Sequence, residues 1–233
     1  MSLASEKVRG VRELPLFPLP IVLFPGAPLP LHIFEERYRQ LLRDVMLGQR
    51  MFGLSYFDPD MSSLGTPIEG HLGCVAEVRQ VETLPDGRSN ILTFGLIRYH
   101  VEEYVTTDEP YLIGHVTFFE DEPEDPADLI MAADAVRDLF TRIGASIHIL
   151  SNERGGLPDL PEEIDPETLS FLVASAMDLE NETKLELLAL RETSARLAQL
   201  TELLERVVEN YEERARVHKV AHTNGHSGKK LEI

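Results

Sequence analysis

A run of 21 residues without a charge, Leu14–Phe34, is the feature that most limits how this chain can fold. Its length would allow a helix that spans a membrane, and the basic residues before it resemble the start of a signal peptide. Six prolines lie within the run, and each proline inside a helix costs about 3 kcal/mol. The run also contains no good cleavage site for a signal peptidase. It therefore predicts short extended segments in a cytoplasmic protein, with neither a membrane span nor a secretion signal.

The residues up to about position 119 have the pattern of short strands around one helix. Apolar residues recur at helical spacing from Phe34 to Met46, and Gly48 follows where a helix commonly ends. Leu84–Arg88 contains the Asp-Gly pair of a hairpin turn. The predicted strands cover residues 14–19, 21–24, 51–57, 74–81, 90–105 and 111–119. About six strands around one short helix predict a small β-barrel, since closure of a sheet removes its edges.

The second half of the chain has the pattern of helices. Asp125-Pro126 and Asp165-Pro166 place a capping carboxylate before a proline suited to the first helical position. We expect helices at residues 126–150 and 166–177, a third that Asn181 caps, and a fourth through 197–211. The predicted fold class is α+β. The predicted organisation is a loose N-terminus over 1–10, a β-barrel over 11–122, a helical subdomain over 123–213 and a disordered tail over 214–233.

Composition limits the chemistry that the chain can perform. A single cysteine excludes a disulfide framework and any site that needs several cysteines. The formal net charge is −18, which disfavours binding to a phosphate backbone. Residues 99–136 contain 11 acidic and no basic residues. This segment is interpreted as a solvated linker with acids at helix N-termini, although it could also attract basic partners.

Isolated motifs do not form a catalytic or metal site. Cys74 lies in a strand-like run without an adjacent base, so it is predicted to be a core residue. His218, His222 and His226 have helical spacing but lie in the predicted tail, and a weak metal site is the alternative. The remaining motifs are assigned to structure: Asp58 and Asp60 to a surface loop, the two PxxP motifs to the buried barrel, and the leucines of residues 197–211 to helix packing rather than a coiled-coil seam.

Several motifs together resemble the N-terminal domain of Lon proteases. These are the run Leu14–Gly26 with Leu29-Pro30-Leu31, Ile33-Phe34-Glu35 and Tyr38; Gly73–Val78; Leu84–Gly87; Gly95–Arg98; and Pro110-Tyr111-Leu112. The helical half is similar to the family's C-terminal subdomain by pattern only. The resemblance implies a PUA-like pseudo-barrel followed by a helical bundle. It also implies a role in recognising unfolded or damaged polypeptide.

The chain resembles a stand-alone form of that domain. No Gly-x-x-x-x-Gly-Lys-Ser/Thr motif, which would bind ATP phosphates, occurs in the sequence. Neither the ATPase nor the Ser-Lys protease domain of Lon is recognisable. We therefore expect no catalytic residue, no cofactor and no metal, and a partner that is unfolded polypeptide rather than nucleic acid or membrane. A separate ATPase or protease could be a further partner, and the oligomeric state stays open.

Peptide binding requires exposed apolar surface or an open sheet edge. The candidate peptide-binding residues are Phe57, Met61, Arg98, Tyr111, Phe118 and Phe119. Arg98 has the alternative role of an ion-paired structural residue. Two other function classes stay open at this point. One is a PUA-like binder of small molecules or nucleic acid; the other, the least favoured, is a hydrolase.

Overall fold

The computed structural model describes residues 2–57, 71–151 and 156–224. The chain divides into two compact units. Unit 1 comprises Met1–Glu122 and Asp178–Arg191, and unit 2 comprises Pro123–Met177 and Glu192–Ile233. The expected barrel over 11–122 and helical part over 123–213 therefore differ from these units at one segment. Residues 178–191, which were expected in the helical part, belong to the barrel unit.

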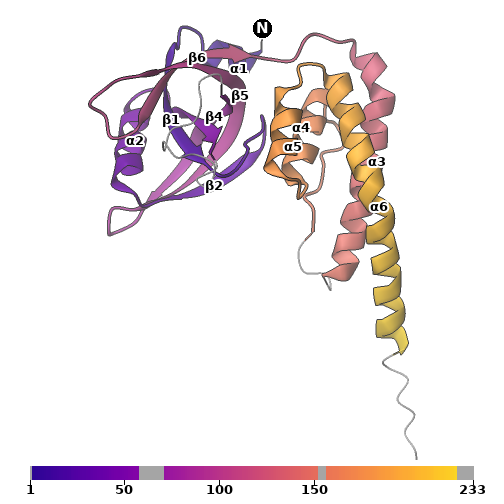
Figure 1. The fold of residues 1–233 in the computed structure, drawn as a ribbon. Coiled ribbons are helices and arrows are strands. Elements are labelled where there is room, and N and C mark those ends of the chain that lie inside the picture. The colour runs from indigo at the N-terminus through magenta and orange to yellow at the C-terminus, as the bar shows by residue number, and fades with distance from the viewer. Residues whose placement is uncertain (1, 58–70, 152–155, 225–233) are drawn as a thin grey trace, which may run out of the picture. The chain divides into compact units, whose positions relative to one another are not determined.

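Unit 1 is built on one six-stranded sheet (Figure 1). The strands are β1 (Glu13–Leu19), β2 (Pro28–Ile33), β3 (Met51–Tyr56), β4 (Leu72–Thr83), β5 (Ser89–Val105) and β6 (Leu112–Phe119). Their order is β2-β5-β4-β3-β1-β6, and a further pairing of β5 with β6 closes the sheet. β1 and β3 run parallel, while the other pairs are antiparallel. The predicted barrel of six strands is thus confirmed.

One predicted strand is wrong. Residues 21–24 lie outside any strand, and β2 instead forms at Pro28–Ile33. Leu23 and Phe24 are buried as side chains of an irregular segment. The carbonyl groups of Ala27 and Leu29 point to β5, since Ala27 accepts from the Gly95 N–H and Leu29 from the Thr93 hydroxyl. The alternation of a strand then turns Pro28 and Pro30 to the free edge, where a missing N–H costs no ladder bond.

Three helices lie in the described part of unit 1. The α2 helix (Glu36–Leu47) ends at Gly48, as the sequence predicts, and buries Tyr38, Leu41, Leu42 and Val45. The α1 helix (Leu3–Lys7) lies in the segment that was expected to be loose. It is held because both Ser2 and Ser5 donate hydrogen bonds to the Glu120 carboxylate. The α5 helix (Asn181–Ala189) buries Leu187 and Leu188. Its N-cap is Glu180 rather than the expected Asn181, whose amide donates to the Pro20 carbonyl (3.4 Å).

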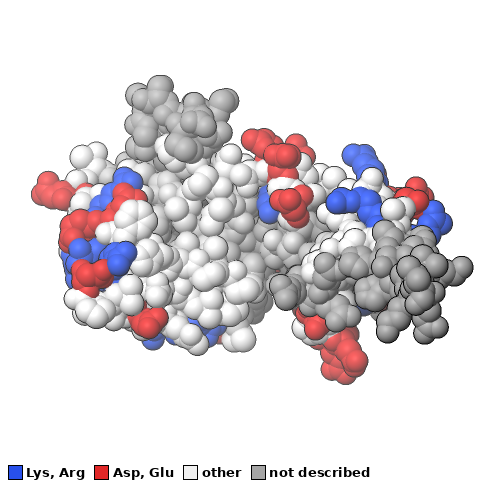
Figure 2. Space-filling view, turned by 90° about the horizontal axis from the view of Figure 1, so that it is seen from below, with Lys and Arg blue, Asp and Glu red and all other residues white. Residues whose placement is uncertain are grey.

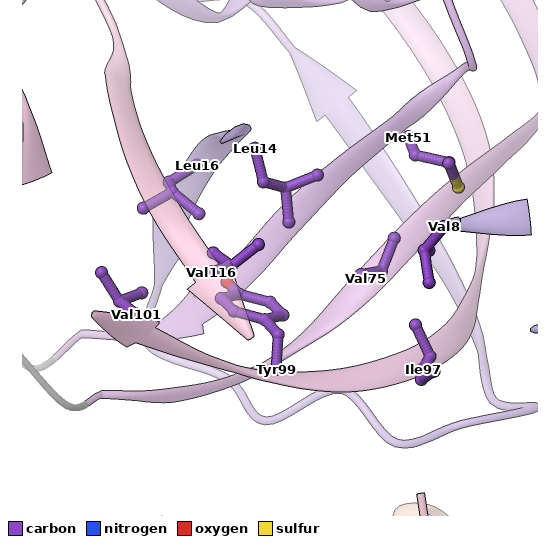
Figure 3. Packing of buried hydrophobic residues seen from close by; sticks show 9 residues of the cluster. All are labelled: Val8, Leu14, Leu16, Met51, Val75, Ile97, Tyr99, Val101 and Val116. Carbon is purple, nitrogen blue, oxygen red and sulfur yellow. The ribbon is translucent and has the colours of Figure 1, made fainter. Parts of the chain in front are cut away.

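The core of unit 1 lies inside the closed sheet. Figure 3 shows the buried cluster, to which the strands contribute Leu14, Leu16, Met51, Val75, Ile97, Tyr99, Val101 and Val116. Val8, next to α1, completes it, which is why the N-terminal residues are ordered against the barrel. The Tyr99 hydroxyl is fully buried and lies 2.7 Å from the Ser55 hydroxyl, so the one polar atom of the ring is hydrogen-bonded.

Unit 2 contains α3 (Pro126–Leu150), α4 (Pro166–Ala176) and α6 (Thr193–Asn224). The Asp125 and Asp165 side chains cap α3 and α4 by accepting the N–H of Ala127 and of Thr168 (both 2.9 Å), as predicted. α6 continues through Asn224, so the predicted disordered tail from 214 is helical for half its length. Ala215 is buried in this extension. Residues 225–233 lie outside the described residues.

The two long helices of unit 2 run side by side in the same direction (Figure 1). Ser194 N–H donates to the Glu124 carboxylate, and Arg142 donates to Glu212 (2.8 Å). In both hydrogen bonds the two partners are 70 residues apart in sequence. The residues of α3 and α6 that lie side by side therefore keep the same offset at both ends of the pair. The leucines at 197, 200 and 204 are buried between the helices of this unit, in accord with the packing interpretation.

A charged cross-strand cluster on the barrel leads to a pH prediction. His115 of β6 contacts Glu103 of β5 (2.7 Å) and Glu13 of β1 (3.1 Å) through its two ring nitrogens. Glu103 first and Glu13 second raise the pKa of His115 above its ordinary value of 6.5. The protonated His115 therefore stabilises the fold. This stabilisation is fully present below about pH 6.5 and is lost as the pH rises through the pKa of His115 in the folded state.

We therefore expect a His115 NMR titration midpoint above 6.5 and a shallow loss of thermal stability above that pH. The substitution His115→Gln should remove this dependence of thermal stability on pH. The NMR spectrum of the variant should remain that of a folded protein. A titration midpoint at or below 6.5 would contradict the assignment.

Candidate functional site

The ladder between β1 and β6 stops where two prolines would meet. Leu16 pairs with Leu112, so continuation of this antiparallel register would place Pro18 opposite Pro110. The Leu19 carbonyl accepts the Phe57 N–H (2.9 Å) and so faces β3. By alternation the backbone of Pro18 faces the side of β6. Neither proline has an N–H to donate, and the pairing therefore ends at Leu16 and Leu112.

A pocket of about 220 Å³ lies at this point in unit 1. Its apolar and aromatic lining is Pro18, Tyr38, Phe57, Pro110, Tyr111 and Leu112, and the exposed charged residues Arg37 and Glu109 complete it. The structure thus brings together Phe57 and Tyr111, two of the predicted peptide-binding residues. The sequence analysis did not predict the other six lining residues. The proline pair could have been found only from the strand register, which the sequence does not reveal.

Contacts behind the pocket fix its two tyrosine rings. The Tyr38 ring stacks on Phe17 with a centroid separation of 3.8 Å, and the Arg37 guanidinium lies 4.5 Å from its centroid. The Tyr111 hydroxyl donates to the Asp44 carboxylate (2.9 Å). Burial is the main cause that raises the pKa of both tyrosines. Both rings are therefore neutral at physiological pH and are held in place before any ligand arrives.

Exposed apolar surface in the pocket comes from other residues. Phe57, Pro18 and Leu112 are each half-buried, whereas Tyr38 and Tyr111 retain less than a tenth of their surface. The pocket is large enough for one side chain and presents ring and aliphatic surface to it. This arrangement can bind an apolar group by excluding water.

Among the described candidates, Phe118 and Phe119 do not line the pocket. Phe118 is partly buried against the barrel core. Phe119 stacks on His100 (4.7 Å between centroids) and contacts Arg98. Met61, Asp58 and Asp60 lie outside the described residues.

Arg98 is a buried structural residue. It is 1% exposed and forms an ion pair with Asp121. Its guanidinium also donates to the carbonyls of Leu188 (2.8 Å) and Leu190, and it lies 4.5 Å from the Phe119 ring centroid. These contacts tie the α5 segment and residue 121 to β5 within unit 1. The structure shows the ion-paired role that the sequence left open, and we do not include Arg98 in the proposed site.

The candidates for chemistry are placed as follows. Cys74 is fully buried, and burial raises the pKa of its thiol to about 12, so it is an inert core residue. Within the described residues, no group of three or more His, Cys, Asp or Glu side chains is placed to hold a metal ion. His218 lies on α6, while the side chains of His222 and His226 are outside the described part.

Comparison with known proteins identifies the fold. Residues 13–206 match the family described as the ATP-dependent protease La (LON) substrate-binding domain. The chain belongs to this family. All eight residues of the pocket fall within the matched range.

Curated Lon proteases match this LON substrate-binding domain along most of its length. The Lon protease of Cytophaga hutchinsonii is 25% identical over 221 residues, which cover 91% of this chain and 26% of the relative. That of Heliobacterium modesticaldum is 27% identical and covers 88% of this chain and 25% of the relative. The chain therefore spans about a quarter of the length of these relatives.

Solved structures show the same LON substrate-binding fold. A Lon N-terminal domain protein from Xanthomonas campestris is 24% identical with a TM-score of 0.59, covering 82% of this chain and 97% of that one. The N-terminal domain of Lon protease from the Mycobacterium avium complex is 18% identical with a TM-score of 0.60, covering 83% and 98%. These structures support the fold, and the family match supports a role in substrate recognition.

An uncharged surface also belongs to this LON substrate-binding domain. Part of the run Leu14–Phe34 lies at the surface of unit 1, and Pro20, Pro28, Pro30 and Phe34 are exposed. The expectation that both PxxP motifs are buried is therefore wrong for Pro28, since its ring lies at the free edge of β2. Figure 2 shows charged residues interleaved at the end of unit 1 that carries α2, beside a broad area without charge. Within the described residues, no helix is long and apolar enough to cross a membrane.

Proposed function

We propose that this chain binds unfolded or damaged polypeptide and catalyses no reaction itself. The pocket at the end of the β1–β6 ladder takes an apolar side chain of the bound segment. The observation that carries the proposal is the meeting of Phe57, Pro18 and Leu112, each with exposed apolar surface, around fixed tyrosine rings. Membership of the LON substrate-binding family supports the same role.

The bound segment is extended rather than helical. A pocket that holds one side chain beside a sheet end suits a chain whose alternate side chains point to opposite sides. The uncharged surface of unit 1 gives additional area for contact without a specific sequence. Unfolded proteins expose such extended apolar segments, and folded proteins seldom do.

A further part of the proposal concerns partners. The relatives named Lon protease are about four times as long as this chain and match it over about a quarter of their length. We infer that this protein works in the cytoplasm as an adaptor or chaperone-like factor, and that an ATP-dependent protease can receive the bound polypeptide. The net charge of −18 opposes nucleic acid as the ligand.

The substitution Phe57→Ala tests the pocket. Loss of a phenyl contact is expected to weaken binding of a reduced, unfolded model protein by about tenfold or more, because burial of such a side chain contributes about 1.5–3 kcal/mol. Fluorescence anisotropy of the labelled unfolded protein measures the affinity. The control is Leu47→Ala, which removes an apolar side chain that is 90% exposed and lies outside both the pocket and the run Leu14–Phe34.

If Phe57→Ala and the natural protein bind the unfolded protein with equal affinity, the pocket is not the binding site. Absence of binding by the natural protein to any unfolded chain would overturn the proposed function.

A further inference from the structure

The two charged side chains that line the pocket differ in whether they form an ion pair. The Arg37 guanidinium contacts the Glu35 carboxylate (2.9 Å) and covers the Tyr38 ring. Glu109 is exposed and lines the pocket, and no cation pairs with its carboxylate among residues 2–57, 71–151 and 156–224. The charge that the pocket offers to a ligand is therefore negative.

The backbone of the pocket also favours a ligand that donates hydrogen bonds. Pro18 and Pro110 have no N–H, and alternation along β1 turns the Pro18 carbonyl to the side where β6 has ended. Prolines can accept hydrogen bonds there but cannot donate them. A ligand that brings N–H groups meets acceptors, and one that brings only carbonyl or carboxylate oxygens does not.

The surroundings strengthen this preference. Asp108 precedes Glu109 in the same exposed loop. Unit 1 contains 12 Lys and Arg residues against 22 Asp and Glu residues, a net charge of −10. The negative field of Glu109 also reaches the pocket wall, since it contributes to the raised pKa of Tyr111. A charge of this sign attracts cationic segments over a Debye length of about 10 Å.

We propose that the pocket selects polypeptide segments in which an apolar side chain has a lysine or arginine one or two residues away. The apolar group enters between Phe57 and Pro18, and the cation lies against Glu109. This inference rests on the proposed function and defines its substrate class. It predicts that unfolded segments with acids beside their apolar residues are poor ligands.

The test compares short unstructured peptides that differ at one position. Each contains a central phenylalanine flanked by lysine, glutamine or glutamate, and a fourth has alanine in place of phenylalanine beside lysine. Affinities are measured by competition against the labelled unfolded protein at low and high salt. We expect the lysine peptide to bind about two- to fivefold more tightly than the glutamine peptide at low salt, the range of an exposed ion pair. The difference should disappear at high salt.

Variants assign the effect to one carboxylate. Glu109→Gln should abolish the preference for lysine over glutamine, and Glu109→Lys should reverse it in favour of glutamate. Asp108→Asn is the comparison variant, because it removes a neighbouring charge outside the pocket lining, and most of the preference should persist. Both positions are exposed, so the variants are expected to fold.

The outcomes separate the two proposals. Equal binding of the lysine and glutamate peptides, with Phe57→Ala still weakening both, would overturn the charge selection and leave the polypeptide-binding function intact. A lysine preference unchanged in Glu109→Gln would also overturn it. Failure of every peptide and of the unfolded protein to bind would overturn the proposed function itself.

Discussion

The substitution Arg98→Leu is expected to lower the free energy of unfolding by about 3–5 kcal/mol, the cost of breaking a buried ion pair by removing one partner. The side chain is 1% exposed, and its partner Asp121 has a side chain that is 4% exposed. Leucine would leave this carboxylate buried without its cation. It would also leave the carbonyl of Leu188 without its guanidinium donor.

Urea unfolding measures this loss, and hydrogen exchange locates it. Amides of α5 should exchange faster in Arg98→Leu, since the guanidinium holds the C-terminal end of that helix on the barrel. The control is Arg79→Leu, whose side chain is 54% exposed and pairs with Glu77 on the surface. There we expect a change of less than about 1 kcal/mol.

The double variant Arg98→Leu with Asp121→Leu tests the cause. If the cost comes from an uncompensated charge, removal of both partners should recover part of the stability, because a buried ion pair can often be replaced by apolar residues. A single variant as stable as the natural protein, or a double variant less stable than the sum of both single losses, would contradict this explanation.

Helix positions could be predicted from local sequence because their signals are local. The Asp-Pro pairs at 125–126 and 165–166 specify both the cap and the first helical residue, and the side-chain bonds to Ala127 and Thr168 confirm this. The glycine at position 48 ends α2 for a similarly local reason. No knowledge of the distant chain is needed for such contacts.

Features that depend on distant residues were predicted less well. By composition the apolar run 21–24 has the stronger claim to a strand, because two prolines lie in the run 28–33. Only the pairing of the second run with β5 reverses this order. The same limit explains α5. Its sequence predicts a helix correctly, yet its place in the barrel unit depends on Arg98, which lies about 90 residues earlier.

The candidate site was predicted only in part, because some of its features are local and others depend on distant residues. The sequence analysis named Phe57 and Tyr111 among the candidate peptide-binding residues, and these two line one pocket. It could not reveal that the pocket exists, because the opening results from the register that sets Pro18 against Pro110. Arg98 lies in β5, and Phe118 and Phe119 lie in β6. The closure of β5 on β6 directs them to other contacts.

The way in which β5 closes the barrel predicts a second large loss of stability, for the substitution Gly95→Ala. β5 pairs with β2 before this residue and with β6 after it, and at Gly95 the chain touches the segment that leads into β2. The Gly26 N–H donates to the Gly95 carbonyl, and the Gly95 N–H donates to the Ala27 carbonyl (both 2.9 Å). A Cβ atom at position 95 would lie 2.0 Å from the Phe24 carbonyl oxygen, which belongs to the backbone and cannot rotate away.

We therefore expect Gly95→Ala to lower the free energy of unfolding by about 4 kcal/mol or more, because relief of the overlap must break at least one of these two hydrogen bonds. Urea unfolding and circular dichroism measure the effect. The control is Gly156→Ala, where a Cβ atom would have no neighbour within 4 Å and the backbone is not left-handed. That change should be within about 1 kcal/mol of the natural protein. Near-natural stability of Gly95→Ala would show that the close approach of Phe24 to β5 does not exist in solution.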